Sequence, residues 1–352
     1  MLRVGIAGAS GYMGGEVIRV LLQHPQVQID WASSRQTGDI ARFHPNLYGT
    51  NMQLIHPDAI LPVDVAFIAL PTEASISLTR RLLDMDCRVI DLGAAFRLEN
   101  RSDWQRLYGM THPDWELAQQ AVYGIPELHR VKIHSAHLVA NPGCFSSAAI
   151  LALAPLLAQD LIDPEHIYIN SISGSAGVGA ELARAAHHPE LGNNLVPYNV
   201  VDHRHSYEIE QELARLANST TLQVHFTPVY APITRGILNV SHVRPTHELS
   251  RAQWLEVFRA FYDGHPFIRI YDPPDNETDQ WHYRPYPWVS AVAGTNYCHI
   301  GLEFDPRRNR LVIFSVLDSI GKGGAQVGIE NMNLMYDLPR AMGLGAYGRH
   351  PN

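Results

Sequence analysis

The sequence has little of three things: lysine, cysteine and long apolar stretches. Only two of its 27 basic residues are lysines, Lys132 and Lys322, which leaves little room for Schiff-base chemistry because that chemistry needs a lysine amine. The three cysteines, Cys87, Cys144 and Cys298, are too few and too scattered for a disulfide framework. No stretch approaches the roughly 18 consecutive apolar residues of a membrane span. We therefore expect a cytoplasmic protein that does not associate with a membrane.

Charge and composition narrow the class of protein further. The formal net charge of −8 and the pI near 6.1 argue against a nucleic-acid binder. Apolar residues make up 46% of the chain and charged residues 18%, so a large core can form and disorder is excluded. On a prior of roughly 150 residues per domain, 352 residues make about two domains. Residues 1–6 are typical of a strand and not of a signal peptide.

The first part of the chain alternates predicted strands and helices. Short apolar runs typical of buried strands occur at residues 2–7, 27–31, 63–70 and 88–92. Helical spacing occurs at 16–23 and 75–84. Repeated strand–helix–strand units imply a parallel sheet with right-handed crossovers. We predict an α/β fold whose N-terminal, doubly wound Rossmann domain spans residues 1–143 and is completed by a C-terminal helix within about 319–352.

After about residue 145 the pattern changes to more strands per helix. Longer strands are predicted at 167–172, 224–229, 236–243, 299–304 and 310–317. Three helices are predicted: an apolar one at 145–157, one opened by a capping box at Ser250–Gln253, and one with Ser206 as N-cap. This composition favours an α+β catalytic, substrate-binding and oligomerisation domain over residues 144–318, built on a mixed or antiparallel sheet.

A glycine-rich turn joins the first strand to the first helix. The turn is Gly8-Ala9-Ser10-Gly11-Tyr12-Met13-Gly14. Glycines there let the backbone approach a pyrophosphate, and the helix N-terminus supplies amide donors. The spacing G-x-x-G-x-x-G is less specific than G-x-G-x-x-G, so the alternative is a structural turn that happens to be rich in glycine. The position after a strand and before a helix favours a dinucleotide site.

The end of the second strand indicates which dinucleotide binds. An NAD site usually has an acidic residue there, whereas NADP needs a cation and hydroxyls for its 2′-phosphate. Asp30 comes too early, and Ser33, Ser34 and Arg35 follow it. The hydroxyls can donate to a phosphate and Arg35 can pair with it, although a solvated loop arginine is the alternative. We therefore predict NADP (NADPH) as the cofactor.

Cys144 is the strongest candidate for a catalytic residue. A Pro142-Gly143 turn delivers it to the start of the apolar helix at 145–157. A helix N-terminus stabilises a thiolate, which is the form that nucleophilic catalysis requires. Cys87 and Cys298 lie in apolar strand contexts and fit the alternative of a buried, inert cysteine.

These features occur together with segments that resemble one family along nearly the whole chain. Beside the glycine turn they are Ala69-Leu-Pro71, Asp91-Leu-Gly-Ala-Ala-Phe-Arg-Leu98, Tyr123-Gly-Ile-Pro-Glu-Leu128, Asn141-Pro-Gly-Cys144, His203-Arg-His205 with Glu208-Ile209, Phe226-Thr-Pro228, Thr234-Arg-Gly-Ile237, Lys322-Gly323 and Asn331-Met-Asn333. In this order they resemble the N-acetyl-γ-glutamyl-phosphate reductases and their relatives. The resemblance implies a glyceraldehyde-3-phosphate-dehydrogenase-like fold and NADPH-dependent reduction of an acyl phosphate to a semialdehyde.

The resemblance also implies roles for individual residues. Cys144 would form a thioester, and His203 would be the general acid/base, with His205 as the nearby alternative and a substrate contact. Substrate carboxylate recognition needs a guanidinium, which Arg204 or Arg235 could supply; nothing in the sequence chooses between them.

Two further assignments concern the cofactor and metals. Ser319 stands where the family has an asparagine near the nicotinamide, so we expect it to contact the cofactor. A metal bound by His187, His188, His203 and His205 is disfavoured, because no acidic or Cys-x-x-Cys spacing accompanies them.

Two branches of the family remain open. One reduces free N-acetyl-γ-glutamyl phosphate in arginine synthesis, and the other reduces aminoadipyl or glutamyl phosphate linked to a small amino-group carrier protein in lysine or arginine synthesis. The segments 44–47, 187–190 and 294–297 resemble the carrier-dependent branch. Residues 175–180 lack the Gly-Ala-Gly-Arg run that is usual in the other branch. The net charge of −8 is unfavourable if the carrier is acidic, unless arginines cluster locally. We favour the carrier branch.

Partners and remote alternatives complete the expectations. The partners are the small acyl-phosphate substrate, the carrier protein and further copies of this chain in a dimer or tetramer. A Cys-dependent hydrolase or an NADP-binding redox sensor would also use a thiolate, but a hydrolase leaves the glycine turn and Arg35 unexplained. A sensor would bind NADPH without turning over an acyl phosphate.

Overall fold

The computed structural model describes residues 1–217, 219–272, 286–345 and 347–348. The chain divides into two compact units, called unit 1 and unit 2 below. Unit 1 comprises residues 1–142 and 324–346, and unit 2 comprises 143–323 and 347–352. Of the region 319–352, in which the C-terminal helix was predicted, residues 346 and 349–352 lie outside the described part.

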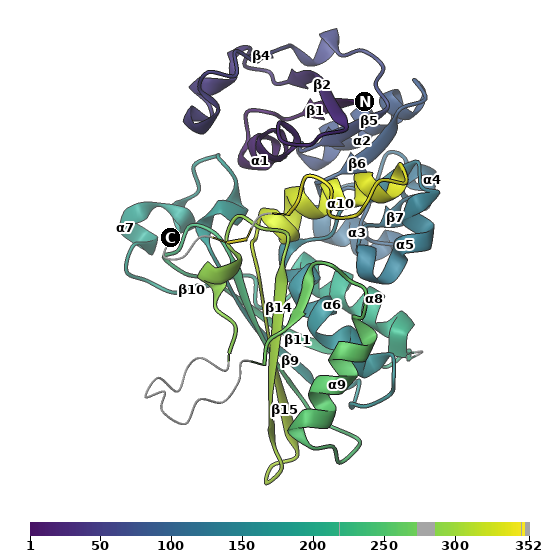
Figure 1. Ribbon diagram of the computed structural model, residues 1–352, viewed down its shortest axis with the longest axis vertical. Coiled ribbons are helices and arrows are strands. Elements are labelled where there is room, and N and C mark those ends of the chain that lie inside the picture. The colour runs from purple at the N-terminus through teal and green to yellow at the C-terminus, as the bar shows by residue number, and fades with distance from the viewer. Residues whose placement is uncertain (218, 273–285, 346, 349–352) are drawn as a thin grey trace. The chain divides into compact units, whose positions relative to one another are not determined.

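Unit 1 is built on a six-stranded sheet in the order β2-β1-β5-β6-β8-β7, and all its neighbouring strands run parallel (Figure 1). The strands are β1 (Leu2–Ala7), β2 (Val27–Ser33), β5 (Val65–Ile68), β6 (Arg88–Asp91), β7 (Val122–Tyr123) and β8 (Leu138–Ala140). In the register, Ala7 pairs with both Ser33 and Ile68, so the carboxyl ends of three strands meet at one edge. This arrangement is the predicted Rossmann-type sheet, in which ligands bind at the carboxyl edge.

Helices and a small hairpin complete unit 1. The helices are α1 (Tyr12–Leu21), α2 (Thr72–Leu83), α3 (Arg101–Tyr108), α4 (Trp115–Ala118), α5 (Pro126–His134) and α10 (Gln326–Met335). Between β2 and β5 lie the short strands β3 (Gly38–Asp39) and β4 (Gln53–Leu54) and the 3-10 turns η1 (Ile40–Arg42), η2 (Pro45–Leu47) and η3 (Pro57–Ala59). Helix α3 was not predicted from the sequence, because it buries only Trp104 and so has little apolar periodicity.

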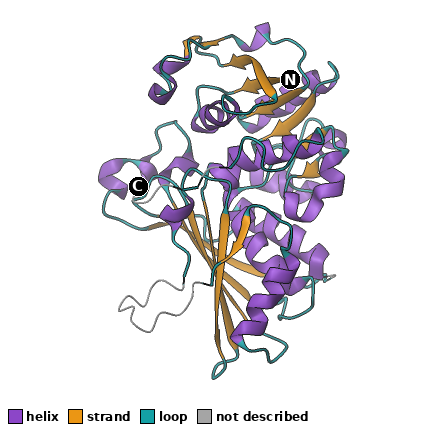
Figure 2. Ribbon diagram, viewed as in Figure 1, coloured by secondary structure: helices purple, strands orange, loops and turns teal. Residues whose placement is uncertain are grey.

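Unit 2 is built on a seven-stranded mixed sheet in the order β10-β11-β9-β12-β15-β14-β13 (Figure 2). The strands are β9 (Ile167–Ser173), β10 (Val196–Pro197), β11 (Val224–Tyr230), β12 (Ile237–Val243), β13 (Ile268–Ile270), β14 (Cys298–Asp305) and β15 (Arg310–Leu317). Three helices, α6 (Cys144–Leu157), α8 (Arg204–Ala217) and α9 (Arg251–Phe261), cover one face (Figure 1). Because helices cover only one face of the sheet, the residues of β12 alternate strictly between buried and partly exposed.

The connection between β9 and α8 is largely irregular. It contains the turns η4 (Ser175–Val178) and η5 (Arg184–Ala186), the one-turn helix α7 (His188–Leu191) and β10.

The helix starts in unit 2 test two capping predictions. At α9, Ser250 and Gln253 form both hydrogen bonds of a capping box, as predicted. At α8 the prediction of Ser206 as N-cap is wrong. The helix begins at Arg204, and the Ser206 hydroxyl donates to the His203 carbonyl at 2.6 Å. The His203 ring instead accepts from the His205 amide in the first turn, so the imidazole takes the place that a cap side chain usually fills.

In the described part of the chain, no helix is long and apolar enough to cross a bilayer.

Candidate functional site

The turn after β1 has the geometry of an anion-binding loop. Gly8 has φ +83°, and a Cβ placed on it would lie 2.2 Å from the Ala69 carbonyl oxygen. A Cβ on Gly14 would lie 2.4 Å from the Gly8 carbonyl oxygen, so both positions require glycine. Gly11 precedes α1, where no described side chain caps the helix and the first turn has no acid. The amides at this helix start are therefore suited to bind a pyrophosphate.

The end of β2 lies directly beside this loop. The Ser33 carbonyl accepts from the Gly8 and Ala9 amides, each at 3.0 Å, while the Ser33 side chain is buried. The hydroxyls of Ser34 and Ser10 are 2.8 Å apart. Arg35 is exposed and forms no hydrogen bond or ion pair with any residue that the structure describes. The structure thus places the Ser34 hydroxyl beside this loop, with Arg35 exposed next to it, whereas Ser33 supports the loop through its backbone carbonyl and does not expose the hydroxyl predicted to bind the phosphate.

Tyr12 and Met13 occupy the first turn of α1. Tyr12 is 46% exposed and Met13 is partly exposed, so the tyrosine ring lies at the surface of the loop. The features of the whole loop fit a dinucleotide. It has glycine where the backbone segments come closest, a helix start without a side-chain cap, and the Arg35 cation near the Ser34 and Ser10 hydroxyls.

Cys144 is the first residue of α6, and Gly143 stands at the N-cap without a side-chain cap. Cys144 is partly exposed, whereas Cys87 and Cys298 are buried, as predicted. The amides and dipole of a 14-residue helix favour a thiolate at this position. The hydroxyls of Ser146 and Ser147, in the same first turns, are buried and hydrogen-bond to nothing in the described residues.

His203 and His205 lie together in unit 2, with ring centroids 4.8 Å apart, and both pack against Phe145. Nδ1 of His203 accepts from the His205 amide at 3.1 Å, so neutral His203 carries its proton on Nε2. Burial, followed by the nearby Arg204 charge, lowers the pKa of His203 to about 4. His203 is therefore neutral near pH 7.

His205 has a different environment. Its Nε2 lies 3.8 Å from Oε1 of Glu208, and a Cβ on Gly143 would lie only 2.4 Å from that same nitrogen. Oε2 of Glu208 accepts from the Gly143 amide at 3.0 Å. Glu208 therefore connects the His205 ring to the residue preceding Cys144. The sequence analysis did not assign Glu208 a role, although its position three residues after His205 places both on one helix face.

The predicted substrate arginines differ in their surroundings. Arg204 is exposed at the start of α8. Arg235 donates through Nε and Nη2 to the two carboxylate oxygens of Asp318, at 2.8 and 3.1 Å. An anionic substrate at Arg235 would have to share this guanidinium with Asp318. Ser319 is buried, and its hydroxyl accepts from the Gly236 amide at 3.2 Å, so a backbone contact already uses it.

Asp318 and Tyr198 were not predicted from sequence. The fully buried Asp318 also accepts from the Ile320 and Gly321 amides, each at 2.9 Å, so it organises the loop after β15. Tyr198 stacks on Tyr230 with centroids 4.1 Å apart. Burial first, then Tyr230 and Cys144, raise the pKa of Tyr198, so its phenol stays protonated. Asp318 pairs with Arg235 and Tyr198 stacks on Tyr230, and both partners are distant in the sequence, so local sequence patterns do not reveal these contacts.

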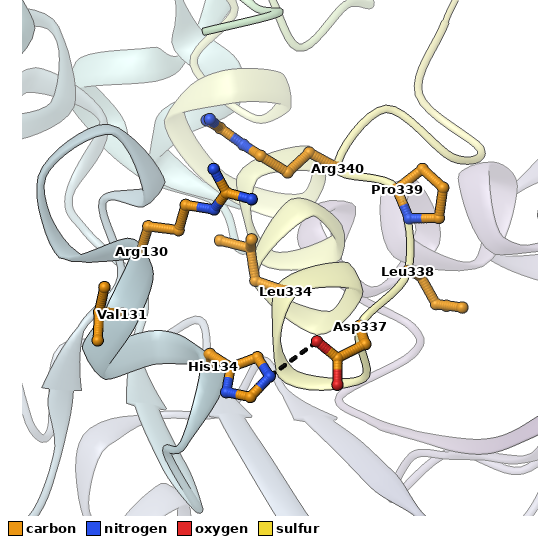
Figure 3. Close-up of a pocket in the computed structure, with 8 residues that line it drawn as sticks. All are labelled: Arg130, Val131, His134, Leu334, Asp337, Leu338, Pro339 and Arg340. Carbon is orange, nitrogen blue, oxygen red and sulfur yellow. Dashed lines mark hydrogen bonds and ion pairs between the residues drawn. The ribbon is translucent and has the colours of Figure 1, made fainter. Parts of the chain in front are cut away.

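A cavity of about 400 Å³ lies elsewhere in unit 1, between α5 and the chain after α10 (Figure 3). No predicted site residue lines it. Arg130 and Leu334 face it, and the His134–Asp337 pair at 2.8 Å lies at its edge. Across the ranges that the structure describes, no three His, Cys, Asp or Glu side chains are grouped to hold a metal.

Two family models cover most of the chain. The semialdehyde dehydrogenase NAD-binding domain matches residues 3–136, and the semialdehyde dehydrogenase dimerisation domain matches 144–319. Solved structures share the fold. Aspartate semialdehyde dehydrogenase II of Vibrio cholerae, complexed with ASA, superposes with a TM-score of 0.71 at 17% identity, over 96% of this chain and 98% of that one. Aspartate semialdehyde dehydrogenase of Candida albicans, solved with NADP, superposes with a TM-score of 0.61 at 15% identity, over 96% of this chain and 98% of that one.

Together with the relatives named next, these matches define the class: an oxidoreductase with a semialdehyde dehydrogenase fold and a nicotinamide-dinucleotide-binding domain that acts on an acyl phosphate. The N-acetyl-γ-glutamyl-phosphate reductase of Methanopyrus kandleri is 40% identical over all of both chains, and that of Moorella thermoacetica 39%. A Thermomicrobium roseum protein, provisionally named as a LysW-L-2-aminoadipate 6-phosphate reductase, is 39% identical over 100% of this chain and 99% of its own. The chain therefore belongs to the family of N-acetyl-γ-glutamyl-phosphate reductases and their relatives.

Proposed function

We propose that this enzyme reduces a carrier-protein-linked acyl phosphate, L-2-aminoadipate 6-phosphate or glutamyl phosphate, to its semialdehyde. Unit 1 binds the dinucleotide through residues 8–14 and 33–35, and unit 2 carries the chemistry. The observation that supports the reaction most directly is a partly exposed Cys144 at the uncapped start of α6 beside two imidazoles. Family membership in a group of reductases leaves the hydrolase and sensor alternatives without support.

The proposed chemistry begins at the Cys144 thiolate. It attacks the acyl-phosphate carbonyl, the C–O bond to phosphate breaks, and a thioester remains on the sulfur. NADPH, when bound, supplies the hydride that reduces this thioester. The resulting thiohemiacetal releases the semialdehyde when its C–S bond breaks, and an imidazole moves the proton that leaves the hydroxyl.

Two imidazoles compete for the proton-transfer role. The sequence points to His203, whose Nε2–H can donate. Its low pKa and its engaged Nδ1 make it a poor proton acceptor near neutrality. Nε2 of His205, by contrast, lies 3.8 Å from the Glu208 carboxylate, and the ring lies directly against Gly143, the residue before Cys144. We therefore propose His205 as the acid/base.

The carrier-linked substrate is supported by surface features of the 174–203 connection as well as by the family segments. Leu182 is fully exposed and Val201 81% exposed, in a stretch whose Arg184 pairs with Glu190 at 3.4 Å. Exposed apolar side chains near paired charges are suited to a transient protein contact. The alternative is free N-acetyl-γ-glutamyl phosphate, which the names of the relatives from Methanopyrus kandleri and Moorella thermoacetica favour.

Reverse turnover separates these substrates. The full chain is given NADP and phosphate with either N-acetylglutamate semialdehyde or the carrier-linked aminoadipate semialdehyde, and NADPH formation is followed by absorbance. We expect NADPH with the carrier-linked compound only. NADPH with the free acetylated compound alone would make this an arginine-synthesis enzyme. Leu182→Ser, with Leu61→Ser as a control on another exposed leucine, should raise the KM for the carrier-linked compound and leave kcat unchanged.

We also propose that the enzyme is a homo-oligomer formed through unit 2, the part matched by the dimerisation-domain model. The sheet face opposite the side chains that pack on α6, α8 and α9 carries apolar, partly exposed residues such as Leu238, Val240 and Phe314. In the β12–β15 register Val240 pairs with Phe314, and Leu238 lies two residues before Val240 on the same face of β12, so a second copy can bury these side chains together.

A further inference from the structure

The excursion between β2 and β5, residues 34–64, contacts the glycine loop of unit 1 through two buried side chains: Ser34, whose hydroxyl lies 2.8 Å from that of Ser10, and His44. His44 is 7% exposed and Leu47 4%, whereas the neighbouring Tyr48 is 87% exposed. His44 precedes η2, and its amide is held by the Ile40 carbonyl at 3.0 Å. His44 and Leu47 thus face inward from this turn, and the His44 imidazole reaches the glycine loop.

The imidazole binds the backbone of the loop. Nε2 of His44 lies 2.9 Å from the Ala9 carbonyl oxygen. Because a carbonyl only accepts, Nε2 must carry the proton and donate it. Ala9 lies between Gly8 and Ser10, in the segment that the proposed function assigns to the pyrophosphate.

Holding the Ala9 carbonyl also fixes the next amide. In a trans peptide the C=O of one residue and the N–H of the following residue point in opposite directions. The Ser10 N–H is thereby turned away from His44, and it donates to no residue in the described part of the chain. A backbone amide that is fixed in direction and makes no hydrogen bond within the protein can donate one to a phosphate oxygen.

A second contact fixes the ring itself. A Cβ on Gly15, in the first turns of α1, would lie 2.3 Å from Cε1 of His44 and 2.6 Å from both ring nitrogens. The imidazole therefore fits against α1 only because residue 15 is glycine. The ring bridges the loop and the helix that follows it.

We infer that His44 is a positioning residue for the dinucleotide: its Nε2–H holds the Ala9 carbonyl so that the Ser10 amide faces the pyrophosphate. This inference rests on the proposed cofactor site in residues 8–14. It assigns His44 no contact with the 2′-phosphate or with the reacting carbon. Its loss should weaken NADPH and NADH equally and leave the Cys144 chemistry intact.

The test is a fluorescence titration of the full chain with NADPH and with NADH, which needs no acyl phosphate and is independent of the substrate assignment. His44→Phe keeps an aromatic ring and removes the donor, and we expect about tenfold weaker binding of both dinucleotides, the size of one lost hydrogen bond. His44→Gln, whose amide can reach the same carbonyl, should restore binding to within about threefold. Gly15→Ala, which displaces the ring, should reproduce the loss. His56→Phe is the matched control, because His56 is an exposed histidine of the same excursion.

Three results would overturn the inference. Unchanged binding in His44→Phe would remove the role altogether. A loss for NADPH only would place the effect at the 2′-phosphate. Equal losses in His44→Phe and His44→Gln would assign the effect to ring packing, a structural role that thermal melts of the same variants would also report. Arg35→Ala, measured in parallel, reports separately on the proposed 2′-phosphate site.

Discussion

At the scale of single residues, turnover depends on which imidazole exchanges the proton. His205→Asn removes the ring beside Glu208 and Gly143, and we expect kcat to fall about a hundredfold or more, within the range for loss of a general acid/base. His203→Asn should lower kcat about tenfold and leave the pH profile in place, because His203 is already neutral there. The measurement is kcat against pH for both variants. A larger loss of kcat in His203→Asn than in His205→Asn would assign the acid/base role to His203, as the sequence predicts.

Arg35 is the residue on which the cofactor preference depends. Because it lies exposed beside Ser34 and pairs with no described residue, we expect its guanidinium to pair with the 2′-phosphate. Arg35→Ala should weaken NADPH at least tenfold while NADH binding stays within about twofold. Equal losses for the two dinucleotides in titrations would contradict this assignment. Arg42→Ala, on an exposed arginine of the same excursion, is the control.

At the scale of elements, the starts of α6 and α8 carry the proposed catalytic groups and pack closely. Gly143→Ala would bring a Cβ to 2.4 Å from Nε2 of His205, so the ring or the turn must move. We expect kcat to fall more than tenfold, and the free energy of unfolding to fall by about 1–3 kcal/mol, the usual range for overpacking. Gly345→Ala, where an added Cβ meets no atom within 4 Å, is the control. Normal turnover in Gly143→Ala would show that His205 need not touch this turn.

The elements also show what the sequence could and could not predict. The apolar runs at β1 and β5, the capping box of α9 and the turn before Cys144 are local patterns, and the structure confirms their elements. The start of α8 was misplaced because the His203 ring, and not Ser206, takes the cap position. Glu208 and Asp318 were missed as organising residues because their partners, Gly143 and Arg235, are 65 and 83 residues away.

At the scale of the whole molecule, buried histidines make stability depend on pH. The pKa values of His203 and His299 are about 4, lowered chiefly by burial, against 6.5 in an unfolded chain. Between these values the unfolded state binds protons that the folded state does not, so stability is complete above pH 6.5 and falls as pH drops toward 4. From pH 7.5 to 5 we expect a loss of about 2 kcal/mol for each histidine.

Denaturant unfolding at pH 7.5 and pH 5 measures this loss. His299→Gln should reduce the difference between the two pH values, and His166→Gln, on an exposed histidine, should leave it unchanged. An unchanged difference in His299→Gln would show that this imidazole does not resist protonation in the folded protein.

The central claim for the molecule is that Cys144 forms the thioester on which the reduction proceeds. The direct measurement omits phosphate: the full chain is mixed with NADP and semialdehyde, NADPH is counted in the first turnover, and the protein is analysed by mass spectrometry. Oxidation of the thiohemiacetal should yield about one NADPH per active site and leave the acyl group on the peptide that contains Cys144. Cys144→Ser should give neither product and still bind NADPH. An acyl adduct on another residue, or a burst that persists in Cys144→Ser, would contradict the account.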